Sequence, residues 1–339
     1  MMMLYWKRGE TVAENTDLLF NQIEKPEISL VNSNTSLFII GNGFDLMHDV
    51  PSSYYNFRDF LGRNNSLRNA LENYIKRDDL WADFEESLAH LDDDAMLGTT
   101  NDMVDIYDVK PQFDEDSLAA NFFMAAEAAI GPAQTIMREL PGEFRKWVST
   151  LKISNSEKPL ADILNNEPKF ITFNYTEFLE TIYGIPRKNI WYIHGDRREK
   201  NKKLILGHAP ESEFHGKDNT EKFGRESSKI KNQTEYDLRE TAGYGLIEYY
   251  DATTKKSDDV IKDNKDKFEN FRYIENVIVI GHSLSQVDYP YFKEIIKHNQ
   301  NAADMNWHIS WYSSEDLKRI KQFVLEMNIS HSKLKIFRT

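Results

Sequence analysis

Residues Leu37 to Asp45, LFIIGNGFD, constrain the fold of this chain more than any other segment. Four consecutive apolar residues predict a strand buried on both faces, which is the pattern of a parallel sheet. Gly41 and Gly43 then allow a sharp turn at the C-terminal end of the strand, where nucleotide phosphates bind in open α/β sheets. A dinucleotide fingerprint needs a third glycine where Leu46 stands, so a plain glycine turn is an equal alternative.

Further along the chain, strand patterns alternate with helical ones. Short apolar runs predict strands at Lys169–Phe173, Asn189–Ile193, Leu204–Leu206, Val277–Ile280, Asn306–Tyr312 and Lys333–Phe337. Apolar residues at helical spacing predict helices at Glu235–Tyr250, Asp258–Phe271, Tyr291–His298 and Glu315–Met327. This alternation favours an α/β protein with a Rossmann-like, mainly parallel sheet and helices on both of its faces.

One long stretch, about 52–165, has few strand signals and a helical pattern, with interruptions predicted at Pro132 and at Pro141-Gly142. We therefore expect a single α/β domain over 35–339 that carries a large helical insertion after its first strand. The remaining segments are expected to be an irregular lead-in at 1–34 with a short helix around Thr11–Ile23, a loop at Asp92–Asp116, and a long loop or lid at 211–232.

The composition excludes several kinds of protein. Lys and Arg number 42 against 55 Asp and Glu, and the net charge of −13 argues against nonspecific binding to nucleic acid. The chain has no Cys, so disulfides and thiolate metal sites are excluded. It has neither a continuous apolar run that would span a bilayer nor a signal-peptide pattern, so we expect a cytoplasmic protein without membrane contact.

Polar residues follow three further predicted strands. Asn174 comes after Lys169–Phe173, His194 after Asn189–Ile193, and Gly281-His282-Ser283 with Asp288 after Val277–Ile280. Because the C-terminal ends of parallel strands lie along one edge of a sheet, we expect these groups and the glycine turn to converge on one site.

Each of these residues also has a structural interpretation when it is taken alone. Asn174 and Glu177 have the spacing of a helix capping box. His194 and His282 are as well explained by turns in which the ring bonds to the backbone. His208 and His215 have no ligand-like neighbours, and no metal-binding spacing occurs, so we expect no metal.

Taken together, the motifs resemble the AbiH family, which is named for bacteriophage abortive infection. The elements that carry the resemblance are GNGFDL at 41–46 followed by Pro51-Ser52-Ser53-Tyr54 and Phe57, LWADFE at 80–85, FNYT at 173–176 with Leu179-Glu180, IHG at 193–195, and GHSL at 281–284 with Asp288. The resemblance covers roughly residues 37–300. It implies an antiviral protein of the bacterial cytoplasm.

The AbiH family is in turn distantly similar to the sirtuin/DHS-like NAD-binding fold. That similarity implies a glycine loop that holds NAD, an Asn that faces the ribose and a His before Gly that acts as base. Gly41, Gly43, Asn174 and His194 occupy those places. The chain lacks the zinc-binding cysteines of sirtuin deacetylases and has Thr176 where they have Asp, so the similarity implies NAD hydrolysis instead of deacetylation.

The resemblance implies the following roles. His194 would be the base, since histidine titrates near neutral pH, and Asn174 would hold a ribose hydroxyl and the attacking water. Asp45 would meet a ribose hydroxyl or cap the following helix. The residues expected to bind NAD are Gly41, Asn42, Gly43, Phe44, Asp45, Gly281, His282, Ser283 and Asp288, the last two on the adenosine ribose.

Two other functions stay open. The chain would suit a module that senses a nucleotide or binds a partner without turnover, which binds NAD or a related nucleotide and gates a second protein. A homo-oligomer or a phage-sensing partner protein is a further expectation. A metal-dependent nucleic-acid-processing enzyme is a third interpretation, with Asp92, Asp93 and Asp94 as ligands, although such acidic runs are usually solvated loops.

Overall fold

A computed structural model describes residues 22–23, 35–93, 95–96, 115–154, 158–164, 168–210 and 233–339. The chain groups into two compact units. The first contains residues 1–52, 151–202 and 257–339, and the second contains residues 53–150 and 203–256. The sequence pattern predicted one domain with one insertion, whereas the second unit is assembled from two separate chain segments.

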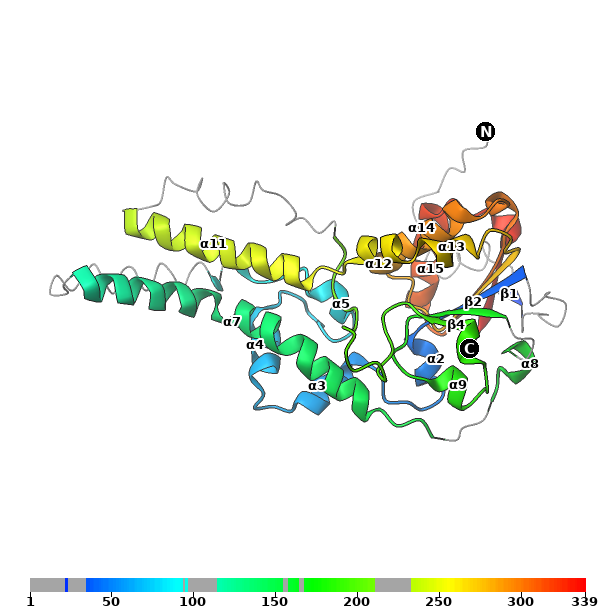
Figure 1. The fold of residues 1–339 in the computed structure, drawn as a ribbon, viewed down its shortest axis with the longest axis horizontal. Coiled ribbons are helices and arrows are strands. Elements are labelled where there is room, and N and C mark those ends of the chain that lie inside the picture. Colours follow the sequence, from blue (N-terminus) through cyan, green and yellow to red (C-terminus); the bar gives the residue numbers. More distant parts are fainter. Residues whose placement is uncertain are drawn as a thin grey trace. The chain divides into compact units, whose positions relative to one another are not determined.

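The first unit is built on a seven-stranded sheet in the order β1-β7-β6-β5-β2-β3-β4, and every pairing in it is parallel (Figure 1). The strands are β1 (Gln22–Ile23), β2 (Ser36–Ile40), β3 (Lys169–Thr172), β4 (Ile190–Tyr192), β5 (Asn276–Ile280), β6 (Asn306–Trp311) and β7 (Leu334–Arg338). This topology confirms the predicted Rossmann-like α/β class.

The glycine turn follows a central strand. β2 lies between β5 and β3, with Ile40 beside Ile280 and Thr172, and all five of its residues are buried. Burial on both faces accounts for the continuous apolar run that marks this strand in the sequence. Since all strands are parallel, the C-terminal ends of β5, β2, β3 and β4 are four neighbours along one edge.

The helices of the first unit are α2 (Asn42–Leu46), α8 (Ala161–Leu164), α9 (Phe178–Thr181), α12 (Ser257–Asp263), α13 (Lys265–Glu269), α14 (Tyr289–His298) and α15 (Ser314–Glu326). Single 3₁₀ turns occupy Arg187–Asn189, Gln286–Asp288, Ala302–Asp304 and His331–Lys333. α15 begins at a capping box, in which Ser313 and Asp316 each accept the other's backbone N–H.

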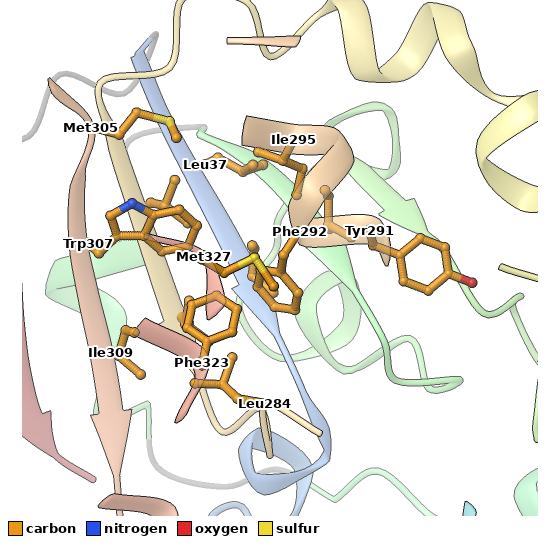
Figure 2. Packing of buried hydrophobic residues seen from close by; sticks show 14 of the residues in the cluster. Leu37, Leu284, Tyr291, Phe292, Ile295, Met305, Trp307, Ile309, Phe323 and Met327 are labelled. Carbon is orange, nitrogen blue, oxygen red and sulfur yellow. The ribbon is translucent and has the colours of Figure 1, made fainter. Parts of the chain in front are cut away.

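The main hydrophobic core lies between the sheet and helices α14 and α15. Figure 2 shows Phe292 of α14 and Phe323 of α15 packed with Met327 beside Trp307 and Ile309 of β6. The ring centroids of Phe292 and Phe323 are 4.8 Å apart in an edge-to-face arrangement. This packing holds β5 and β6, and with them the loop that follows β5.

The second unit is helical, with α3 (Tyr54–Leu61), α4 (Ser66–Tyr74), α5 (Phe84–Ser87), α7 (Glu115–Thr150) and α11 (Gln233–Thr253). α7 packs beside α11 and α4 (Figure 1). It runs through Pro132 and Pro141, so the predicted interruptions are wrong. Each proline removes a helical hydrogen bond, but a buried apolar face from Ala129 to Val148 holds the helix in place.

Three other sequence expectations differ from the structure. Leu204–Leu206 forms no strand, and Asp258–Phe271 forms two short helices in place of one. Gln22–Ile23 is a strand, although it was assigned to the lead-in and to the end of a short helix. The rest of the lead-in up to residue 34, most of the acidic stretch (97–114) and the expected lid at 211–232 lie outside the described residues.

Candidate functional site

The glycine turn after β2 is pressed against the end of β5. The Gly41 N–H donates to the Ile280 carbonyl at 3.0 Å, and the Gly43 N–H donates to the Gly281 carbonyl at 2.7 Å. A Cβ atom on Gly41 would lie 2.4 Å from the Cα of His282, and one on Gly281 would lie 2.2 Å from the Phe44 nitrogen. Gly281 also has φ +62°. Close backbone contact therefore explains these three glycines.

That contact uses the backbone donors of the turn. The Gly41 and Gly43 N–H groups are committed to β5 and its loop, and the Phe44 N–H donates to the Gly41 carbonyl at 2.9 Å. The Phe44 side chain is fully buried and packs on His48, Phe178 and Tyr183. Asn42 is the exposed residue of the turn.

Asp45, on α2, reaches across to the loop after β3. One carboxylate oxygen accepts the Asn174 Nδ2–H at 2.8 Å, and the other accepts the Thr176 hydroxyl at 2.5 Å. The Asp45 side chain therefore caps no helix. Because both of its oxygens already accept hydrogen bonds within the chain, we do not assign it to a ribose hydroxyl. Asn174 forms no capping box either, because α9 begins after Glu177 without a side-chain cap.

The environment of Asp45 disfavours its charged form. Burial raises the pKa of the carboxyl to about 6, and the hydrogen bonds from Thr176 and Asn174 and the charge of Arg197 only partly oppose this effect. Glu177 raises the pKa further. Arg197 and Glu177 are themselves paired at 2.7 Å. Asp45 thus titrates close to neutral pH, where a small change in pH alters its charge.

Asn174 has one amide atom in use and one without a partner. Its Nδ2 donates to Asp45, whereas its Oδ1 is buried and accepts no hydrogen bond from the described residues. A buried acceptor left in this state costs about 1–3 kcal/mol. Such a group is a candidate for binding a water molecule or a ligand hydroxyl.

Two histidines flank one buried carboxylate in the same unit. Asp288 Oδ1 lies 3.4 Å from His194 Nε2, and Asp288 Oδ2 lies 3.4 Å from His282 Nε2. All three residues are buried. His194 follows β4, His282 follows β5, and Asp288 ends the 3₁₀ turn before α14. Asp288 is thus within ion-pair distance of both rings, where its charge would stabilise an imidazolium, as in carboxylate–histidine pairs of enzymes.

The two clusters are joined through the loop after β3. Phe173, next to Asn174, makes edge-to-face contacts with His194 and His282, at ring-centroid distances of 4.9 and 4.3 Å. The Tyr291 ring, which points away from the other labelled core residues in Figure 2, lies 5.7 Å from the His194 ring. The structure therefore brings His194, His282 and Asp288 together, against Phe173 in the loop that also contains Asn174.

The His282 ring is held in one tautomer. The Leu284 N–H donates to His282 Nδ1 at 2.9 Å, so in the neutral ring the proton lies on Nε2, which faces Asp288. Leu284 has φ 51°, a conformation that costs energy in a residue other than glycine. Ser283, between them, is exposed.

The other candidates belong to the second unit or are outside the described residues. His208 belongs to the helical unit, where its Nδ1 bonds to the Ala209 carbonyl, and His215 is outside the described residues. Asp92 pairs with Lys76, Asp93 accepts the Tyr250 hydroxyl, and Asp94 is not described. No group of three or more His, Asp or Glu in the described ranges is arranged to hold a metal ion.

The fold and this cluster define a Rossmann-like α/β protein with a polar site at the C-terminal ends of its strands. A family model described as "Bacteriophage abortive infection AbiH" matches residues 37–311, so the chain belongs to the AbiH family. The family implies a role in phage abortive infection. No curated protein and no solved structure matches the chain. Among the described helices, none combines the length and hydrophobicity that a membrane span requires.

Proposed function

We propose that this AbiH protein binds NAD and hydrolyses the bond between nicotinamide and ribose, so that NAD is depleted in an infected cell. The proposal is carried by two residues that follow neighbouring strands. Asn174 has a buried carboxamide oxygen that accepts no hydrogen bond from the described residues, and His194 lies within ion-pair distance of Asp288. Glycosidic cleavage needs such a combination of a hydroxyl acceptor and a base.

The proposed reaction needs no strong acid. The bond between C1′ of the ribose and the pyridinium nitrogen breaks, and its electron pair stays with nicotinamide, which leaves as a neutral molecule. A water oxygen bonds to the oxocarbenium-like C1′, and the water proton passes to His194. The products are nicotinamide, ADP-ribose and one proton. Asn174 Oδ1 accepts a ribose hydroxyl, which fixes the sugar beside the base.

The rest of the dinucleotide would extend over exposed residues of the same edge. Gly41, Gly43 and Phe44 already donate their N–H groups within the chain. The exposed Asn42 is therefore our choice for the pyrophosphate, and the exposed Ser283 is our choice for the adenosine ribose. Asp288 is assigned to the histidines in place of the ribose, because both of its oxygens face imidazole nitrogens.

The test is incubation of the purified protein with NAD, with and without phage lysate, followed by assay of nicotinamide and ADP-ribose. We expect release by the wild type and a loss of about 100-fold or more in His194→Gln and in Asn174→Ala. His331→Gln is the matched control, since His331 is exposed on a turn before β7. Absence of release in every condition would refute hydrolysis. Tight NAD binding without release would assign a sensing role instead.

A further inference from the structure

The strongest unassigned feature is the position of Asp45 behind Asn174. Asp45 is buried, contacts no cation at hydrogen-bond distance in the described chain, and accepts the Asn174 Nδ2–H and the Thr176 hydroxyl. We propose that Asp45 is a positioning residue, whose ionised carboxylate fixes the Asn174 amide so that Oδ1 is the atom presented to the substrate. This inference rests on the proposed function.

The argument starts from the symmetry of a carboxamide. Rotation by 180° about the last bond of Asn174 would exchange Nδ2 and Oδ1 with little change in shape. An ionised carboxylate has no proton to donate, so it accepts from Nδ2 and repels Oδ1. The charge on Asp45 therefore selects one of the two orientations, and the selected one leaves Oδ1 available.

Protonation of Asp45 removes this selection. A carboxylic acid donates its proton as well as accepting, so it can bond to either end of the amide. The charged groups around Asp45 are the Arg197–Glu177 pair, which act in opposite directions on its pKa, and burial sets the value at about 6. The orientation of Asn174 should consequently change within the physiological range.

Thr176 binds the carboxylate oxygen of Asp45 that does not contact Asn174. Its hydroxyl donates to the other oxygen of Asp45 and lowers the pKa of that carboxyl. It also keeps that oxygen from turning towards Asn174. We therefore expect loss of the hydroxyl to move the titration of Asp45 to higher pH.

The first experiment follows nicotinamide release from NAD between pH 4.5 and 8.5. We expect the wild-type rate to fall on the acidic side with a midpoint near 6, the pKa of Asp45. Asp45→Asn should have a rate about tenfold lower at pH 8, because its side chain is always neutral and no longer selects one orientation of the Asn174 amide. Thr176→Val should move the acidic midpoint to higher pH, which separates the titration of Asp45 from protonation of the base. Asp49→Asn makes the same change at an exposed aspartate four residues away and should keep the wild-type profile.

The second experiment does not depend on turnover. The Asn174 side-chain amide signals are followed by ¹⁵N NMR across the same pH range, with Asn174→Asp used for assignment. We expect the signals to shift with a midpoint near 6 in the wild type, at higher pH in Thr176→Val, and not at all in Asp45→Asn. If Asp45→Asn does not fold, the Thr176→Val shift decides.

The two experiments separate the two claims. If NAD is never cleaved but the amide titrates as described, hydrolysis fails and the role of Asp45 stands. If NAD is cleaved while the Asn174 amide signals do not follow Asp45, the positioning role is overturned. A rate at pH 8 that is unchanged in Asp45→Asn, or no midpoint shift in Thr176→Val, also overturns it.

Discussion

The two units each contain a carboxylate that is shielded from solvent, half-buried Glu85 in the helical unit and buried Asp45 in the sheet unit, and the partners of the two differ. In the helical unit, Glu85 lies 2.5 Å from the Nζ of the fully buried Lys255 and accepts the Tyr54 hydroxyl at 3.0 Å. In the sheet unit, Asp45 receives only the neutral donors Asn174 and Thr176. Glu85 belongs to the LWADFE element, and Asp45 belongs to GNGFDL.

This difference separates a stabilising arrangement from a reactive one. Removing one partner of an ion pair such as Glu85–Lys255 leaves the other charge unpaired, which lowers the free energy of unfolding. Burial raises the pKa of Asp45 because the hydrogen bonds from its neutral partners only partly oppose the loss of solvation, and perturbed pKa values cluster at functional sites. The acidic residues of the two family motifs thus have different roles. Glu85 of LWADFE stabilises the helical unit, and Asp45 of GNGFDL, we propose, acts in the site.

The largest effect on stability should come from removing the ion pair between Glu85 and Lys255. Lys255→Met leaves Glu85 without its cation, and we expect a loss of about 3 kcal/mol or more in the free energy of unfolding. Urea denaturation measures this loss. The double variant Lys255→Met/Glu85→Leu should recover most of it, because no charge is then left unpaired. Equal stability of Lys255→Met and the wild type would remove the distinction that we draw.

The next effect concerns the unpaired carboxylate and depends on pH. Burial raises the pKa of Asp45 from 3.8 to about 6. Because the folded-state value is the higher one, its contribution to stability is fully present below pH 3.8 and is lost as the pH rises through 6. The difference between the values corresponds to about 3 kcal/mol. Urea denaturation at pH 4 and pH 7.5 should show this loss in the wild type but not in Asp45→Asn.

A smaller effect on stability is expected where the segments after β2 and β5 touch. Gly41→Ala places a Cβ atom 2.4 Å from the backbone of His282, and neither strand end can move away freely. We expect a loss of about 1–3 kcal/mol in stability, as for other overpacked sites. Thermal unfolding measures it, and a variant as stable as the wild type would show that the contact is loose.

The smallest effect has the opposite sign. Gly142 lies in α7 with nothing within 4 Å of an added Cβ atom. Gly142→Ala should therefore stabilise the protein by about 0.5–1 kcal/mol, the usual gain from replacing glycine inside a helix. The same thermal unfolding assay applies. A destabilised Gly142→Ala would indicate that this position has a contact partner that the structure does not explain.

Much of the fold could be predicted because the signals are local. β2, β3, β4, β5, β6 and β7 each follow from a short apolar run. Leu204–Leu206 has such a run but belongs to the helical unit, where no sheet provides a partner strand. The prolines of α7 predict interruptions that the structure lacks, because local propensity does not include the packing of a long buried face. Division into two units depends on contacts between distant segments.

The sequence predicts which candidate residues share one edge of the sheet, but it does not predict the hydrogen bonds between them. The edge containing Asn174, His194 and His282 follows from parallel strands. Asp45 bonds to a residue 129 positions away, so nothing near it in the sequence distinguishes this bond from a helix cap. The pattern of the glycine turn likewise predicts phosphate binding, whereas in the structure these glycines contact the backbone after β5.

The contact between Gly41 and the loop at Gly281 has a consequence for how the family diversifies. With no space for a side chain between them, the segment after β2 and the segment after β5 form one structural joint. A lengthened loop or a larger residue on one side requires a matching change on the other. AbiH chains that vary in this region should therefore vary in both places together, and grafting either loop alone into a relative should fail where exchanging the pair succeeds.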